Sequence, residues 1–155
     1  MGFTRAVVIK RLHQSLSRDP EFVASFLDEA RLAARITHPH VAPTLDIVVT
    51  SGEPFLVMEY IHGESLSTLM AAARQRAIPV PVAVGILVDA LNGLHAAHQA
   101  SDTHGEPLEI VHRDVSPQNL LVGADGITRV LDVGIVKVRV HQGAGPTNRV
   151  NSTFA

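Results

Sequence analysis

Cysteine is absent from the 155 residues, and lysine is scarce. Without cysteine the chain can form no disulfide, no thiolate zinc site and no thiol nucleophile. Only Lys10 and Lys137 among the 13 basic residues are lysines, so the chain does not use lysine as a general surface charge. A lysine at a defined place in the sequence, above all Lys10, therefore calls for a specific explanation.

The chain also lacks a concentration of positive charge and a long hydrophobic run. Its net charge is −2 and its basic residues are scattered, so the basic stripe typical of nucleic-acid binders is missing. The longest apolar stretch, 78–88, contains two prolines and falls short of the ~20 residues that span a bilayer. The first residues show no signal-peptide pattern. We therefore expect a cytoplasmic protein that binds neither nucleic acid nor membrane.

Hydrophobic residues make up 46% of the chain, enough for one globular domain with a buried core. In the N-terminal third, β-branched runs predict strands, an Asp-Pro pair marks a helix start, and a Ser-Gly-Glu-Pro turn indicates a hairpin. The expected elements are a strand over 6–10, a helix from Asp19-Pro20 to before Pro39, and hairpin strands over 44–50 and 55–60.

After Gly63 the pattern changes to helices and one more hairpin. Apolar residues at helical spacing predict two helices, marked by Leu66, Leu69, Met70 and Ala73, and by Val84, Leu87, Val88, Leu91 and Leu94. A loop is expected over 101–107. Two short apolar runs, 120–122 and 127–131, flank an Asp-Gly turn and predict a small hairpin.

Two motifs carry the strongest signal for chemistry. The run HRDVSPQN, from His112 to Asn119, places Asp114 after His-Arg and five residues before the asparagine. The run Asp132-Val133-Gly134 follows 18 residues after Asp114, just beyond an expected strand.

The two motifs resemble the catalytic loop and the metal-binding motif of protein kinases. The run from Val7 to Lys10 resembles the lysine-bearing strand of the small lobe, and Glu29, midway along the first expected helix, resembles the ion-pair partner of that lysine. The run IVHRDVSPQNLLV is similar to a bacterial branch of the Ser/Thr kinases. The resemblance covers nearly the whole chain and implies an α+β, two-lobed fold of the protein-kinase type.

The resemblance also implies ATP and Mg²⁺ as cofactors, and a protein with a serine or threonine hydroxyl as substrate. Lys10 would pair with the phosphates, and Glu29 would hold Lys10 in place. Asn119 and Asp132 would bind the metal. Asp114 would orient the incoming hydroxyl and accept its proton late in the transfer.

The adenine side of the nucleotide site follows from the same resemblance. The run 55–60 resembles the strand that leads into the hinge between the lobes, with Met58 at the gatekeeper position. The backbone from Glu59 to Ile61 would contact adenine, and Leu121 would line the nucleotide site from the other lobe.

Parts of the family pattern do not occur in these 155 residues. No glycine-rich loop precedes Lys10, and neither the APE motif nor further large-lobe helices follow. We expect an incomplete kinase fold, with a small-lobe remnant and hinge over 1–61, a large-lobe remnant over 62–140, and a mobile partial activation segment over 141–155. Transfer by this chain alone should be weak or absent, because the segment that covers the phosphates is missing.

Single substitutions depart from the family as well. Ser116 stands where Ser/Thr kinases usually carry a lysine, Val133 where phenylalanine usually packs, and Val8 where a small alanine is usual. A competing interpretation is therefore a non-catalytic pseudokinase or interaction module.

Two further sets of residues leave a choice of role. Arg113 is either a surface charge or the partner of a phosphate on the segment that holds Thr147, Ser152 and Thr153. His95 and His98 lie three residues apart on a helix, but no third ligand follows nearby, so we interpret them as structural.

Overall fold

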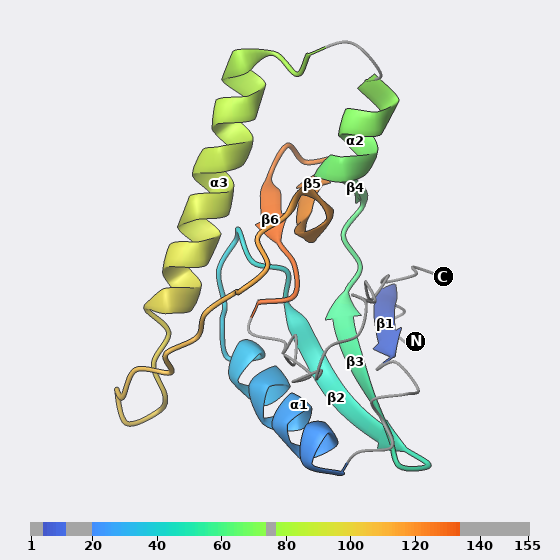
Figure 1. The fold of residues 1–155 in the computed structure, drawn as a ribbon, viewed down its shortest axis with the longest axis vertical. Coiled ribbons are helices and arrows are strands. Elements are labelled where there is room, and N and C mark those ends of the chain that lie inside the picture. The colour runs from blue at the N-terminus through green and yellow to red at the C-terminus, as the bar shows by residue number, and fades with distance from the viewer. Residues whose placement is uncertain (1–4, 12–19, 74–76, 134–155) are drawn as a thin grey trace, which may run out of the picture.

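The computed structural model describes residues 5–11, 20–73 and 77–133, without the side chains of Pro20, Phe22 and Glu29. The elements form two groups, which lie one above the other in Figure 1. The elements, in chain order, are β1 (Val7–Arg11), α1 (Pro20–Ala33), β2 (Thr44–Thr50), β3 (Glu53–Glu59), β4 (Gly63–Ser65), α2 (Leu66–Ala73), α3 (Val80–His98), the 3₁₀ helix η1 (Pro117–Asn119), β5 (Leu120–Gly123) and β6 (Thr128–Val130).

The first sheet contains three antiparallel strands in the order β1-β3-β2. This order confirms the expected pairing of the first strand with the hairpin, and it puts Lys10 opposite Leu56, which is fully buried. The turn is tighter than the sequence suggested, because Ser51 (φ 53°) and Gly52 (φ 78°) alone connect the strands. Two-residue turns with positive φ at both positions match the natural twist of a hairpin. Strand β1, which carries Lys10, lies at the edge of this sheet beside the hairpin.

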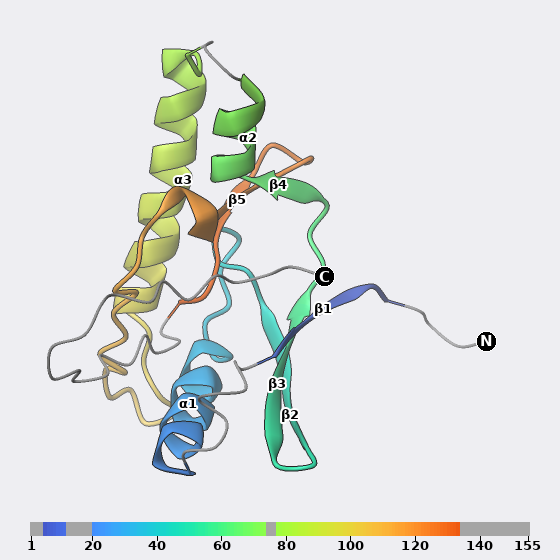
Figure 2. The same cartoon turned by 45° about the vertical axis from the view of Figure 1, so that its right-hand side comes forward.

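Helix α1 packs beside this sheet, as Figure 2 shows. Phe26, Ala30 and Ala33 recur at helical spacing and are all buried. Ala30 shares a buried cluster with Leu56 of β3. The helix ends before Pro39, as predicted, whereas the expected cap Asp19 lies outside the described residues.

The second sheet, in the order β4-β5-β6, includes one strand that the sequence did not predict. Strand β4 has only three residues and none is β-branched, so it carries no strand signal. It forms because Gly63 pairs with Gly123, and a Cβ on Gly63 would lie 2.4 Å from the carbonyl oxygen of Val122. The predicted hairpin of β5 and β6 around Asp125-Gly126 is confirmed, with Gly126 at φ 82°.

A charged turn stabilises that hairpin. The Asp125 carboxylate accepts a hydrogen bond from the Ile127 N–H (3.0 Å) and two from Arg129 (2.7 and 3.2 Å). Mainly through the side-chain hydrogen bond from Arg129, the pKa of Asp125 is lowered from 3.8 to about 2. Because the pKa is lower in the folded state, this exposed contact contributes at pH values above about 4 and is lost as the pH falls towards 2.

Helix α3 buries the face that carries mostly small residues, and most of its large apolar side chains are exposed. Ile86, Ala90, Gly93 and Ala97 are buried, and α3 packs against β6. The larger apolar residues that predicted this helix lie mostly on a different, exposed face, where Val84, Leu87, Val88 and Leu91 remain 49–64% exposed. The apolar periodicity therefore identifies the helix but not the face that contacts the sheet.

Helix α3 as a whole is more apolar than its run without charged residues, which ends at Val88, suggested. Helix α3 is long and apolar enough to cross a membrane by length and composition alone, with a mean hydropathy of 1.5 and 22% of it buried. Its only acidic or basic residue apart from histidine is Asp89, whose carboxylate accepts the N–H of Thr128 on β6 at 2.8 Å. In this fold, therefore, both the small apolar face and Asp89 are in contact with the second sheet.

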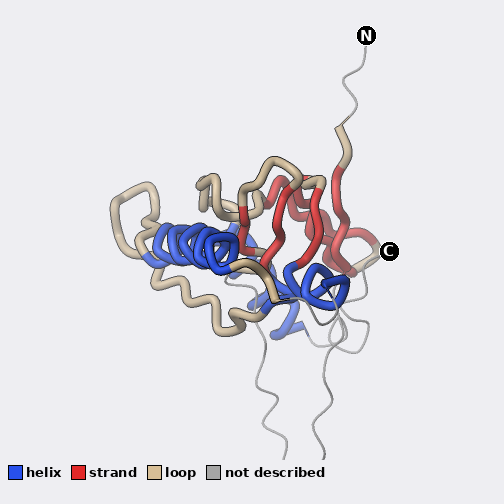
Figure 3. Tube along the Cα trace, turned by 90° about the horizontal axis from the view of Figure 1, so that it is seen from above, coloured by secondary structure: helices blue, strands red, loops and turns tan. Residues whose placement is uncertain are grey.

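The two groups of elements meet where the loop after α1 reaches β6. The Val130 N–H donates to the His40 carbonyl (2.9 Å), and the Ala42 N–H donates to the Val130 carbonyl (3.0 Å). Val41 between them forms a parallel bridge with Val130, and both side chains are buried. Seen from above, α3 lies to one side of the strands (Figure 3). One buried strand residue thus connects the two halves of the molecule.

Replacement of Gly93 by alanine should weaken this junction. A Cβ at Gly93 would lie 2.3 Å from the backbone oxygen of His40, so α3 would have to move away from the loop. We expect the free energy of unfolding to fall by about 1–3 kcal/mol, as for other overpacked sites. Urea denaturation measures it.

The matched control is Gly85→Ala on the same helix, where an added Cβ meets nothing within 4 Å. That change should raise the free energy of unfolding by about 0.5–1 kcal/mol, because alanine is the better helix former. Equal effects of the two substitutions would contradict the described packing of α3 on the loop.

Candidate active site

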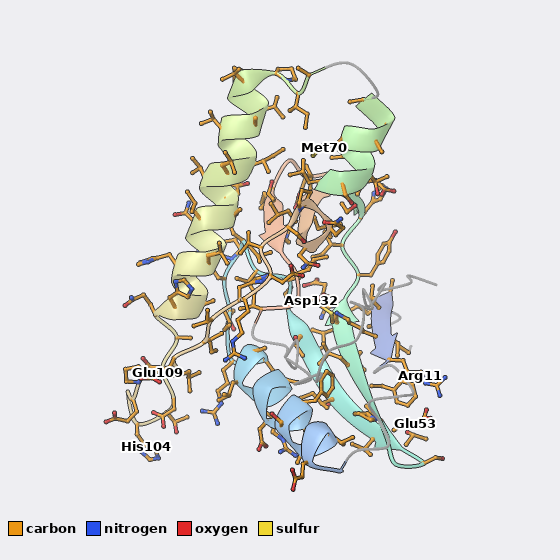
Figure 4. All side chains as sticks on the ribbon, in the orientation of Figure 1. Arg11, Glu53, Met70, His104, Glu109 and Asp132 are labelled. Atoms are coloured by element: carbon orange, nitrogen blue, oxygen red, sulfur yellow. The ribbon has the colours of Figure 1, made fainter. Side chains whose placement is uncertain are left out.

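Lys10 and Asp132 meet at the boundary between the two groups of elements. The Lys10 Nζ lies 2.5 Å from Asp132 Oδ2, although the residues are 122 positions apart in sequence. The two side chains are 34% and 23% exposed, so the pair is only partly solvated. Figure 4 shows Asp132 near the middle of the molecule, beyond the end of β6. The lysine predicted to pair with phosphate and the aspartate predicted to bind metal are therefore in direct contact.

His112 holds the catalytic-loop motif beneath this pair. It is one of the few buried polar residues, at 5% exposure. Its Nε2 lies 2.8 Å from the Leu131 carbonyl oxygen, and its Nδ1 accepts the Asp114 N–H at 3.3 Å. These partners fit the tautomer with the proton on Nε2. These contacts give His112 a structural role, because they link the loop to the residue before Asp132.

Asn119 orients Asp114 through its amide group. Its Nδ2 donates to the Asp114 carboxylate oxygen Oδ2 at 2.8 Å and to the Asp114 carbonyl at 3.0 Å. The Asn119 N–H donates to the Ser116 carbonyl at 2.9 Å within the turn of η1. Since the amide nitrogen is used in this way, the amide oxygen of Asn119 is the atom left to bind a cation.

Backbone contacts also fix Asp132. Its φ of 57° lies in the left-handed region, which aspartate adopts more readily than most residues. The preceding Leu131 donates its N–H to the Asn119 carbonyl at 2.9 Å, and the following Val133 is buried in the core. Val133 thus takes the buried place that the resemblance gives to phenylalanine.

Only some of the residues predicted to contact adenine lie together in one apolar cluster. Met58 is buried, and Ile61 and Val8 pack against the cluster that contains it. The Glu59 N–H donates a hydrogen bond to the Pro43 carbonyl (3.0 Å). Among the described residues no hydrogen bond involves the Ile61 backbone, whose N–H and carbonyl therefore remain for a ligand.

Other predicted residues lie elsewhere or outside the description. Leu121 is half-buried on β5 and pairs with Ser65 of β4, in the second sheet. The Glu29 side chain is not described, so the predicted pair with Lys10 stays a prediction. Gly134 and the segment with the candidate phosphorylation sites also lie outside the described residues. For Arg113 the structure gives a φ of 61° but leaves both roles open.

A cavity of about 310 Å³ lies away from these residues, near the loop after α1. It contains none of the predicted site residues, and its lining is formed by Ala34, Ile36, Thr37, His38, Pro39, Pro43 and Thr44. The cavity is mainly apolar and offers no carboxylate. We therefore assign the candidate active site from the contacts of Lys10, Asp114, Asn119 and Asp132, not from cavity size.

Comparison with known proteins identifies the family. Residues 3–154 match the family described as "Protein kinase domain", and the chain therefore belongs to the protein kinase family. The predicted class of bacterial eukaryotic-like Ser/Thr kinases is confirmed by relatives and by a solved structure.

Three of these proteins give the scale of the similarity. The chain is 44% identical over 138 residues to tyrosine-protein kinase MasK of Myxococcus xanthus, covering 88% of this chain and 21% of MasK. It is 37% identical over 138 residues to serine/threonine-protein kinase PknE of Mycobacterium tuberculosis, covering 89% and 23%. The PknI kinase domain of Mycobacterium tuberculosis matches with a TM-score of 0.73 at 29% identity, covering 87% and 52%.

The chain thus spans about a fifth of the curated relatives and about half of the solved kinase domain. The predicted α+β fold, an incomplete protein-kinase-like fold, is confirmed on this basis.

The structural role of His112 can be tested by its removal. His112→Ala leaves the partly buried Leu131 carbonyl without its partner, and we expect the free energy of unfolding to fall by about 1–3 kcal/mol. Val111→Ala is the neighbouring control, because Val111 is 53% exposed, and its effect should stay within about 0.5 kcal/mol. Urea denaturation of both variants gives the comparison. A neutral His112→Ala would show that the loop does not depend on this bond.

Proposed function

We propose that this chain carries the nucleotide- and metal-binding residues of a protein kinase, which transfers the γ-phosphate of ATP to a protein hydroxyl. One observation carries the proposal. Lys10, Asp132, and the pair Asn119 and Asp114 come from three segments of the chain, and their contacts are connected through Leu131, whose N–H donates to the Asn119 carbonyl. Phosphoryl transfer needs such positioning of charge more than covalent help from the protein.

Lys10 supplies the positive charge for the phosphates. It lies on β1, whose register sets it opposite the buried Leu56, and its long side chain reaches Asp132, which follows the last strand of the second sheet. Adenine would contact the cluster around Met58 and the backbone of Ile61, while Leu121 would line the site from β5. The hinge residue Glu59 accepts a hydrogen bond from Arg5 at 2.5 Å, which holds the two strand ends together.

The residues present fit a divalent metal such as Mg²⁺. Asp132 offers carboxylate oxygens and Asn119 its amide oxygen, the hard donors that Mg²⁺ prefers. Within the described ranges there is no cluster of three or more histidine, cysteine or acidic residues that could enclose a metal. A site with few protein ligands suits Mg²⁺, which usually completes its shell with phosphate oxygens and water. When bound, the metal would neutralise charge on the phosphates.

Asp114 provides the proton acceptor. The hydrogen bond from Asn119 Nδ2 orients its carboxylate. In the transfer, the hydroxyl oxygen of the substrate forms a bond to the γ-phosphorus, and the bond from that phosphorus to the bridging oxygen breaks. ADP leaves with the electron pair, and the hydroxyl proton passes to Asp114 late in the step.

Serine and threonine are the proposed acceptors, because several similar proteins, PknE among them, bear the name serine/threonine-protein kinase. A tyrosine acceptor is the second candidate. It is favoured by the 44% identity with a protein named tyrosine-protein kinase. Ser116 bears on the choice, since it replaces the lysine usual in Ser/Thr kinases.

We further propose that residues 1–61 form the small-lobe remnant with the hinge, and 62–140 the large-lobe remnant. The two separate sheets, one ending at Glu59 and the other beginning at Gly63, support this division. A cytoplasmic location is proposed as well, because the cytoplasm supplies ATP. A non-catalytic pseudokinase remains the alternative function, and the experiments below distinguish it.

Millimolar Mg-ATP should raise the melting temperature of residues 1–155 by about 2–5 °C, because a ligand that binds only the folded state stabilises it. The shift is small since no glycine-rich loop within this chain covers the phosphates. Asp132→Asn should lose most of this shift in melting temperature.

Glu53→Gln is the control, because it also replaces a carboxylate by an amide. Glu53 bonds to Arg11 at 2.6 Å and lies far from Asp132 in Figure 4, so this variant should keep the shift.

A folded sample with no shift at millimolar Mg-ATP would remove ATP from this account. Equal loss of the shift in both variants would mean that general charge, not the assigned site, binds the nucleotide.

Catalysis by residues 1–155 alone should lie near background, because misplacement of the reacting groups by about 1 Å can cost ~10²-fold. A chain extended at both ends by the remaining kinase segments should transfer phosphate from radiolabelled ATP. In it, Asp114→Asn should lower the rate by about 10²–10⁴-fold, the usual contribution of a general base. Analysis of the labelled amino acids then separates serine and threonine from tyrosine.

An extended chain that binds ATP but transfers nothing would support the pseudokinase alternative. Strong transfer by residues 1–155 that is abolished by Asp114→Asn would instead show that the missing segments are dispensable.

A further inference from the structure

The direct contact between Lys10 and Asp132 joins a phosphate-binding cation to a metal-binding carboxylate. Lys10 Nζ lies 2.5 Å from Asp132 Oδ2, and both side chains are more than half buried. Within the described part of the chain, neither side chain has another hydrogen-bond or ion-pair partner. In this state the ammonium group occupies an oxygen that the metal would need.

Of the two partners, Asp132 is held more firmly. The backbone on either side of it is fixed by the bonds of Leu131 to Asn119 and His112, and by the burial of Val133. Lysine, in contrast, carries its charge on a flexible four-carbon side chain. A competing anion can therefore draw Lys10 away, whereas Asp132 has little room to move towards a different partner.

Two cations on one carboxylate repel each other strongly when they are partly shielded from water. A divalent cation that approaches Asp132 must therefore displace Lys10 or remain weakly bound. The phosphates of a nucleotide offer Lys10 another anionic partner, and its departure releases the carboxylate oxygen. Nucleotide and metal then favour each other's binding by the same factor, as thermodynamic linkage requires.

We propose that Lys10 blocks the metal ligand Asp132 until a nucleotide binds, so that nucleotide binds first and the divalent cation second. This inference rests on the proposed function, since it uses the same site. It adds that Lys10 sets the order of binding as well as holding phosphate.

The test measures metal binding to residues 1–155 without nucleotide, with Mn²⁺ as the probe and electron paramagnetic resonance of free Mn²⁺ as the readout. The chain with Lys10 should bind Mn²⁺ weakly, and Lys10→Met should bind it at least ~10-fold more tightly, because the competing cation is gone. Lys10→Gln serves as a second variant of different polarity. Unfolding curves of both confirm that they fold.

Arg11→Met is the matched control. It removes the same charge one position along β1, but Arg11 pairs with Glu53 and not with Asp132 (Figure 4). Its affinity for Mn²⁺ should stay within about twofold of the unchanged chain, since the exposed charge is screened. An equal gain in Mn²⁺ affinity from Arg11→Met and Lys10→Met would mean that general charge, not a block by Lys10, weakens metal binding. No gain in affinity from either Lys10 variant would also overturn the proposed block.

A second titration adds ADP. ADP should tighten Mn²⁺ binding by at least ~10-fold in the unchanged chain, and by clearly less in Lys10→Met, in which the ligand is already free. Equal tightening in both would contradict the proposed order. Failure of ADP to bind at all would remove the proposed function and the order together. Unchanged Mn²⁺ affinity in Lys10→Met, with ADP still bound, would remove only the block.

Discussion

The geometry of the site depends on the peptide groups of a single residue, Leu131. Its N–H donates to the Asn119 carbonyl at 2.9 Å, and its carbonyl lies 2.8 Å from Nε2 of the buried His112. Each bond reaches into the HRDVSPQN segment, so both ends of that segment are tied to the residue that precedes Asp132. A buried peptide group without partners costs free energy, and this requirement keeps the two motifs in register. The two residues proposed to bind the metal, Asn119 and Asp132, are held near each other as a consequence.

The rest of the fold brings Lys10 to this arrangement. Lys10 belongs to the first sheet and Asp132 follows the last strand of the second, so their contact requires a fixed relation between the sheets. Val130 supplies it through its hydrogen bonds to His40 and Ala42, and the close approach of Gly93 packs α3 onto the same loop. Contacts far from the candidate active site thus determine the position of Lys10, the cation that pairs with Asp132 among the described residues.

The sequence predicted much of this because the motifs are local and their order is informative. The strand of Lys10, the hairpin and the loop from His112 to Asn119 could all be located from residue types and spacing. Strand β4 could not, since its three residues have no strand preference and form a strand only because Gly63 and Gly123 approach closely. The contacting face of α3 was equally hidden, because that face is made of small residues.

The contact between Lys10 and Asp132 shows a different limit. Family resemblance pairs the lysine with Glu29, and spacing along the chain gives no reason to prefer Asp132 as its partner. Only the placement of two sheets in space determines that distance, and a sequence pattern contains no such information. The resulting ion pair bears directly on the proposed function, because it joins the groups proposed to bind phosphate and metal.

The central claim is that Lys10, Ile61, Asn119 and Asp132 belong to one nucleotide site. Nitrogen-15 NMR of residues 1–155, titrated with Mg-ADP, tests it most directly. The account predicts that the backbone amide shifts concentrate on these four residues and their neighbours. Shifts concentrated instead on the cavity lined by residues 34–44, or no shifts in a folded sample, would contradict it.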